Sequence, residues 1–145
     1  MLETADRFLQ QFTLFQSILA DTLRRAGRTQ EGLDLVAEGL ESSYRSEEAW
    51  WRAEMLRVRA ELLLALPRQN AHAAERQLRE AIRVAAAQNA RSLELRAATS
   101  LSRLMRMMGR VEEAHQTVAP VFRSMREGLS TQDLLEAQRE IGTRH

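Results

Sequence analysis

The chain of 145 residues contains no cysteine, which excludes disulfides, thiolate-bound zinc and a cysteine nucleophile. It has only 2 prolines and 6 glycines, and 5% of its residues are aromatic. Few residues therefore stop a helix, and few favour strands. Alanine, leucine, arginine and glutamate dominate instead, so the composition predicts an all-α fold that needs neither a metal nor a disulfide.

Long apolar segments are also missing. The longest purely apolar run covers residues 62–67, far below the roughly 20 residues that a membrane helix requires. Residues 1–12, MLETADRFLQQF, carry acids where a secretion signal carries bases followed by an apolar core. These features predict a soluble, cytoplasmic protein that does not associate with membranes.

Lysine is absent, so all 21 strong bases are arginines, against 20 acids and a net charge of +1. This near-neutral balance disfavours a general nucleic-acid binder, which carries a clear basic excess. A guanidinium group is a forked donor that suits carboxylates and phosphates. A local face rich in arginine therefore remains a candidate for binding acidic groups.

Two glycines mark a repeated joint between helices. Gly27-Arg28 and Gly109-Arg110 are the same dipeptide, and each ends one amphipathic stretch and precedes acids in the first turn of the next. Pro67 takes the corresponding place in the middle of the chain, where it stops a helix. We expect turns at all three positions, with a left-handed backbone at the two glycines.

A pattern of small and large residues repeats around these joints, which indicates an internal repeat. A small residue stands seven positions before each joint, at Ala20, Ala60 and Ser102. The helices that follow the joints share positions at offsets of four and three: Gly32, Val36 and Gly39; Ala74, Leu78 and Ala81; Ala114, Val118 and Val121. Small residues allow close helix approach, so these positions should be buried.

The pattern predicts seven helices, at residues 4–26, 29–44, 46–66, 70–88, 91–108, 111–127 and 131–141. The first six form three hairpins at about 4–44, 46–88 and 91–127, and the last caps the array. The small residues Ala20, Ala60 and Ser102 are 40 and 42 positions apart, which leaves extra residues between one hairpin and the next. We attribute these residues to lengthened helices, since no glycine or proline interrupts them. We expect one domain over residues 1–145.

Residues 91–104, RSLELRAATSLSRL, are followed by Gly109-Arg110, Glu113-Ala114, the APV of 119–121 and the segment 127–137. This series resembles the C-terminal tetratricopeptide-repeat region of large bacterial regulators, which join a nucleotide-cyclase or DNA-binding domain to a signalling ATPase. The resemblance covers about residues 50–140. It implies a right-handed α-solenoid and a role in sensing or assembly within a signalling or transcription regulator. It carries over no catalytic residue.

Motifs of enzymatic chemistry do not stand out. The chain lacks a phosphate-binding glycine loop and a Gly-x-Ser-x-Gly elbow. Glu112 and His115 have the Glu-x-x-His spacing of di-iron bundles, but such sites need a second copy and further glutamates. We therefore expect no enzymatic activity, no cofactor and no metal.

The first helix of each tetratricopeptide hairpin lines the concave surface of the array. Six arginines and three acids stand off the packing stripe on these helices, which predicts a basic groove for an acidic protein or peptide. The partner-binding candidates are Arg24, Arg25, Arg57, Glu61, Arg96, Arg103 and Arg106, with Asp21 and Glu54 beside them. The alternative is that these are ordinary surface charges satisfied by helix pairs such as Asp21 with Arg25.

A second hypothesis for function is structural self-association. Phe8, Leu9 and Phe12 begin an apolar stripe on the first helix and have no obvious partner, which predicts a homodimer through this helix. Phe15, Leu19 and Leu23 continue the stripe, and these later members should pack on the second helix. The third hypothesis, nucleic-acid binding through the basic groove, has the least support because no aromatic residue interleaves with the arginines.

Overall fold

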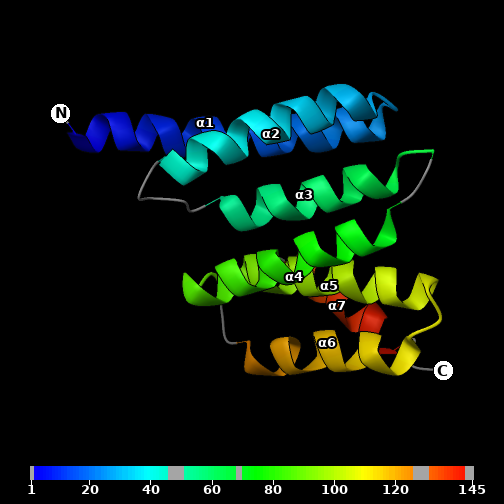
Figure 1. Cartoon of the computed structure of the whole chain (residues 1–145). Helices are drawn as coiled ribbons and strands as arrows, with labels where there is room; N and C mark the ends of the chain where they lie inside the picture. Colours follow the sequence, from blue (N-terminus) through cyan, green and yellow to red (C-terminus); the bar gives the residue numbers. More distant parts are fainter. Residues whose placement is uncertain (1, 46–50, 68–69, 126–130, 143–145) are drawn as a thin grey trace. The chain divides into compact units, whose positions relative to one another are not determined.

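The computed structural model describes residues 2–45, 51–67, 70–125 and 131–142, without the side chains of residues 2–13, 131 and 134. Within these ranges the regular secondary structure is helical and no strand occurs, which confirms the all-α class (Figure 1). The helices are α1 (Leu2–Arg25), α2 (Thr29–Arg45), α3 (Arg52–Leu64), α4 (Ala71–Ala87), α5 (Arg91–Met107), α6 (Val111–Ser124) and α7 (Thr131–Gly142). No helix in the described ranges is long and apolar enough to cross a membrane.

The chain divides into two compact units, residues 1–77 and 78–145. The first unit contains α1, α2, α3 and the start of α4. The second contains the rest of α4 with α5, α6 and α7. The helix packing is therefore described for each unit separately. The continuous array of three hairpins over residues 1–145 stays a prediction.

In the first unit, α2 runs back along α1, and α3 contacts both helices (Figure 1). Glycines allow α2 to approach its neighbours closely. A Cβ atom on Gly32 would lie 3.2 Å from the backbone oxygen of Ala20 and 2.7 Å from Cδ2 of Leu62. A Cβ atom on Gly39 would collide with the Met55 side chain. The small residues of the repeat therefore set the spacing of these three helices.

In the second unit, α5, α6 and α7 contact one another. Each contributes one completely buried side chain to a shared cluster, namely Leu95 from α5, Val118 from α6 and Ala137 from α7. Partly buried apolar side chains surround this cluster: Val121, Phe122, Met125 and Ile141. The packing places α7 against both preceding helices.

The turns after α1 and α5 have the backbone that the Gly-Arg dipeptide predicts. The φ angles of Gly27 and Gly109 are +77° and +78°, in the left-handed region. In both turns the N–H of the following arginine donates to the carbonyl oxygen five residues earlier, at 2.8 Å. Each turn thereby satisfies a carbonyl group that the end of the helix leaves without an intrahelical donor.

A further turn of this kind follows α4, and the sequence pattern did not predict it. Asn89 has φ +57°, and the N–H of Ala90 donates to the carbonyl oxygen of Ala85 at 2.9 Å. Asparagine tolerates the left-handed region better than most residues, so it can replace glycine here. Pro67 lies in a bend shortly after α3, which ends at Leu64.

Two predicted helix boundaries differ from the structure by three residues or more. Helix α3 begins at Arg52 instead of residue 46, and Trp51 before it has φ −100° and ψ 7°. Helix α6 ends at Ser124 instead of residue 127, because Met125 has an extended backbone with ψ 134°. The expectation that lengthened helices account for the residues between the first two hairpins falls partly on residues 46–50, which lie outside the described ranges.

Gly109→Ala should lower the free energy of unfolding by about 1 kcal/mol, because alanine is strained at positive φ. A Cβ atom there would meet nothing within 4 Å, so backbone strain alone is measured. Chemical denaturation gives the difference. Gly142→Ala is the control, since its added Cβ also meets nothing and its φ is not positive. An unchanged or higher midpoint for Gly109→Ala would contradict the strained turn.

Candidate functional site

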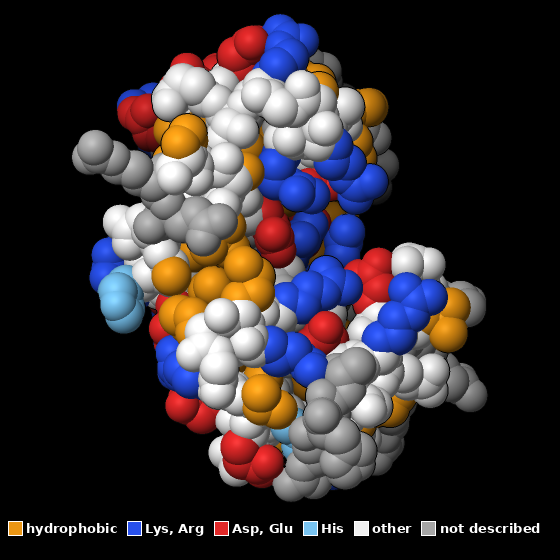
Figure 2. All heavy atoms as spheres, turned by 90° about the vertical axis from the view of Figure 1, so that its right-hand side faces the viewer, with side chains coloured by type: hydrophobic (Ala, Val, Ile, Leu, Met, Phe, Trp, Pro, Cys, Tyr) orange, Lys and Arg blue, Asp and Glu red, His pale blue; other side chains and the backbone are white. Residues whose placement is uncertain are grey.

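The residues predicted to bind a partner fall into two groups, one in each unit. The first group is Arg24, Arg25, Arg57 and Glu61, and the second is Arg96, Arg103 and Arg106. On the face drawn in Figure 2, acidic side chains lie among the arginines instead of leaving an uninterrupted basic surface. The ion pairs within each unit explain this interleaving.

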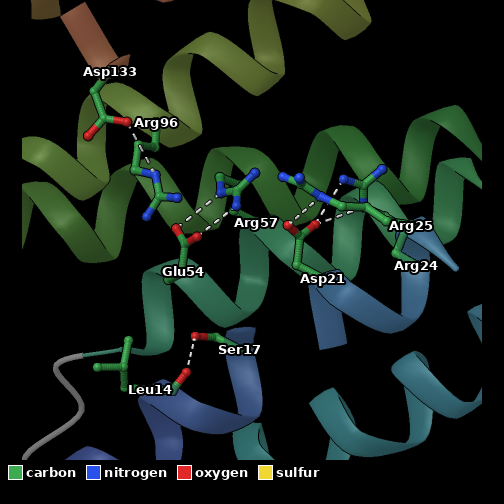
Figure 3. Close-up of polar contacts among 9 residues, drawn as sticks. All are labelled: Leu14, Ser17, Asp21, Arg24, Arg25, Glu54, Arg57, Arg96 and Asp133. Carbon is green, nitrogen blue, oxygen red and sulfur yellow. Dashed lines mark hydrogen bonds and ion pairs between the residues drawn. The ribbon is translucent and has the colours of Figure 1, made fainter. Parts of the chain in front are cut away.

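Asp21 on α1 binds two arginines of the same helix. Arg24 Nε donates to Asp21 Oδ1 at 3.0 Å, and Arg25 Nε donates to Asp21 Oδ2 at 3.1 Å (Figure 3). Burial opposes ionisation of the carboxyl group, but Arg24, Arg25 and the charge of Arg57 outweigh it and hold the pKa of Asp21 below its usual value. Both arginines therefore already have a carboxylate within the helix.

Arg57 on α3 is buried in a bidentate pair with Glu54. The two guanidinium nitrogens donate to the Glu54 carboxylate at 3.0 and 2.7 Å, and the side chains of Glu54 and Arg57 are 6% and 13% exposed (Figure 3). Burial would lower the pKa of Arg57, but the charges of Glu54, Glu61 and Asp21 outweigh it and raise this pKa. Glu61 thus acts on Arg57, and Arg57 presents little surface to a partner.

The first group of charges is balanced. Its three arginines, Arg24, Arg25 and Arg57, stand with three acids, Asp21, Glu54 and Glu61. Asp21 pairs with Arg24 and Arg25, and Glu54 pairs with Arg57, so these pairs join residues three or four positions apart on one helix, as the surface-charge alternative expects. The basic excess of the predicted groove therefore lies on α5.

The α5 arginines meet the acids of α7, which sequence reasoning missed. Glu140 is the most enclosed of these acids, with its side chain 12% exposed. Its Oε2 accepts hydrogen bonds from Ser102 Oγ at 2.9 Å and from Arg106 Nε at 2.8 Å. Arg106 Nη2 also donates to the backbone oxygen of Glu140. Ser102 is completely buried, so one of the donors to Glu140 lies in the core.

Arg103 and Arg96 extend the contact along α5. Arg103 Nη2 lies 3.3 Å from Glu136 Oε2, and its Nε lies 3.7 Å from Glu140 Oε1. Arg96 Nε lies 3.5 Å from Asp133 Oδ1 (Figure 3). The residue numbers of the partners rise together, so α7 runs parallel to α5. Arg96 and Arg103 keep 40% and 48% of their side chains exposed, and solvent reaches these two pairs.

One face of α7 therefore carries two kinds of contact. Asp133, Glu136 and Glu140 stand at i, i+3 and i+7 and point to the α5 arginines, while Ala137 is completely buried against Leu95 and Val118. The sequence pattern predicted α7 as a cap of the helical array. The spacing of its three acids was the available signal, since that spacing places them along one side of a helix.

The predicted oligomer interface lies outside the described side chains, because those of Phe8, Leu9 and Phe12 fall in residues 2–13. The expectation that Phe15 and Leu19 pack on the second helix is wrong, since they are 68% and 51% exposed. Helix α2 packs instead along the side of α1 that carries Gln16 and Ala20, next to Gly39 and Gly32. The homodimer stays a prediction.

The Glu-x-x-His pair of Glu112 and His115 lies on α6. Glu112 Oε1 accepts a hydrogen bond from Gln116 Nε2 at 3.3 Å. Among the described residues, no group of three histidines or acids lies close enough to hold a metal ion.

Comparisons with protein-family models, with curated proteins and with solved structures find no match for this chain. The assignment of function therefore rests on the packing of the helices and on the chemistry of the ion pairs.

Arg57→Met should lower the free energy of unfolding by about 3 kcal/mol, because it removes the bidentate partner of a buried carboxylate. The double variant Glu54→Leu, Arg57→Met removes both charges and should be more stable than Arg57→Met alone. Urea denaturation of the wild type, Glu54→Leu, Arg57→Met and the double variant measures the coupling free energy between the two side chains. A single variant as stable as the wild type would show that the pair is not buried in solution.

Proposed function

We propose that the chain is a non-enzymatic helical-repeat module that binds an acidic protein segment through Arg96, Arg103 and Arg106 of α5. The proposed architecture is a tetratricopeptide-like, right-handed α-solenoid of three hairpins with a C-terminal capping helix. The proposed setting is a bacterial signalling or transcription regulator in the cytoplasm, as the resemblance of residues 91–137 implies.

The burial of the repeat positions supports this architecture. The small residues before the three joints, Ala20, Ala60 and Ser102, are each 0% exposed. Positions shared by the second helices are buried as well, including Val36, Ala74, Leu78, Ala81, Ala114 and Val118. Equivalent positions that are buried in the same way favour a repeated packing unit.

The observation that carries the binding proposal is that three arginines of α5 bind three carboxylates of another helix. Guanidinium groups form strong, directional pairs with carboxylates. The arginines of the first unit pair mainly within their own helices, whereas Arg103 and Arg106 reach acids 33 and 34 positions away in the sequence. A surface that recognises one acidic segment has the chemistry to recognise another.

Fluorescence anisotropy tests the proposal with a labelled, alanine-rich helical peptide that carries glutamates at i, i+3 and i+7. Its glutamine version is the control peptide. The full chain should bind the glutamate peptide, and added salt should weaken binding because the ion pairs are partly exposed. Arg96→Gln, Arg103→Gln should lose this binding, since it removes two of the proposed contacts.

Arg110→Gln, Arg123→Gln is the matched control, since it removes two arginines that the proposal does not use, one directly before α6 and one in its last turn. It should bind the peptide as the wild type does. The proposal fails if Arg96→Gln, Arg103→Gln binds equally well. It also fails if neither the wild type nor a Glu136→Gln, Glu140→Gln variant binds, because the arginines would then be accessible and inactive.

A second candidate function is self-association through α1, and exposed apolar side chains favour it. Phe15, Ile18 and Leu19 are 68%, 54% and 51% exposed at helical spacing. Such a cluster favours an interface, and a two-fold dimer is the commonest closed arrangement. Nucleic-acid binding has less support, because no aromatic residue interleaves with the arginines in the sequence.

A further inference from the structure

The contact between α7 and α5 defines what a ligand of this surface must look like. Three carboxylates must meet arginines that follow one another along α5, and a small apolar side chain must fit between Leu95 and Val118. Residues at i, i+3 and i+7 share a side only when the segment is helical. An extended acidic peptide would place alternate side chains on opposite faces and could not repeat this arrangement.

Ala137 sets a second requirement. It stands next to Glu136 in the sequence, and it is completely buried in the cluster of α5 and α6. A larger residue at this position would need space that the buried neighbours occupy, because protein interiors are close-packed. The ligand pattern is therefore a helix with acids at i, i+3 and i+7 and a small residue at i+4.

We propose that α7 occupies the partner site of this chain in cis, and that the partner is an acidic amphipathic helix with the α7 pattern that displaces it. This inference rests on the proposed function, because it assigns a partner class and a regulation to the same arginines. The C-terminal helix is then a competitor built into the chain.

Helix α7 is held on α5 by few buried apolar side chains and by partly exposed ion pairs, so a partner helix can displace it. Ala137 is the one completely buried apolar side chain among the described side chains of α7, and Leu135 is 42% exposed. Two of the three arginines that hold α7 are at least 40% exposed, so their pairs with it are weakened by water and salt. Much of the attachment thus depends on carboxylates that a partner helix also carries.

Helix α7 belongs to the same chain as α5, with α6 and residues 125–130 between them in the sequence, so it competes with a partner as an intramolecular ligand. A segment of the same chain meets its site at an effective concentration on the order of millimolar. The apparent affinity for a partner falls with the fraction of molecules whose site is free. A partner must therefore bind better than α7, or the α7 contact must first be weakened.

The test uses the full chain and a fluorescein-labelled peptide with the sequence of residues 131–142. Glu136→Gln, Glu140→Gln in the chain removes the carboxylates that hold α7 to Arg103 and Arg106. This variant should bind the peptide with a dissociation constant roughly tenfold lower than the wild type, because charge-assisted contacts in cis are lost. Circular dichroism and light scattering establish that the variant stays folded and keeps the oligomeric state of the wild type.

Glu112→Gln, Glu113→Gln is the matched control, since it also replaces two acids by amides, on the exposed side of α6. Its affinity for the peptide should equal that of the wild type. The peptide has its own control in Ala137→Leu, which keeps all three acids. The leucine peptide should bind at least fivefold more weakly, since the buried position accepts only a small residue.

The outcomes separate this inference from the proposed function. If the wild type and Glu136→Gln, Glu140→Gln bind the peptide equally well, competition by α7 is wrong, although the chain still binds acidic helices. If the leucine peptide binds as well as the parent peptide, α7 is not the template for the partner. A wild type that is dimeric through exchange of α7 between two copies would also overturn occupation in cis.

Discussion

The carboxylate of Glu140 joins α7 to α5, and the second unit is organised around this contact. Its Oε2 accepts hydrogen bonds from the buried hydroxyl of Ser102 and from Arg106 Nε, while Arg106 also donates to the backbone oxygen of Glu140. These contacts fix both the side chain and the backbone of α7 at one point. Ala137 enters the apolar cluster with Leu95 and Val118 one turn earlier. The position of α7 on α5 follows from these two constraints together.

The same residue type has different roles in the two units. Arg24, Arg25 and Arg57 bind acids three or four positions away, which any helix with suitable spacing allows. Arg103 and Arg106 bind acids on a different helix, so their pairs depend on where that helix lies. Local pairs stabilise a helix but select no partner. The pairs across α5 and α7 are the contacts on which the proposed function rests.

Local features of the fold were predictable from the sequence, whereas the meeting of α5 with α7 was not. The helices and the left-handed turns at Gly27 and Gly109 follow from periodicity and from backbone sterics, which act within a few residues. The burial of Ala20, Ala60 and Ser102 follows from the repeat. The exposure of Phe15 depends on which side of α1 faces α2, and a single helical stripe does not determine that side.

The sequence predicted the arginines of the candidate site but not the carboxylates that pair with them. Arg96, Arg103 and Arg106 were identified because they stand off the packing stripe of α5. Their partners were missed because α7 was treated as a cap, and the pairing requires the parallel placement of α7. Acids on the last helix contribute to the charge of the surface only when tertiary contacts bring them there. A count of charges on separate helices therefore overestimated the basic character of the predicted groove.

The central claim is that Glu140 and Arg106 hold α7 on α5, and a double-mutant cycle tests it most directly. The free energy of unfolding is measured for the wild type, Arg106→Gln, Glu140→Gln and the double variant. The contact predicts a coupling free energy of about 1 kcal/mol or more, because two partly buried charged groups share a hydrogen bond. A coupling free energy of zero, with both single variants folded, would contradict the placement of α7.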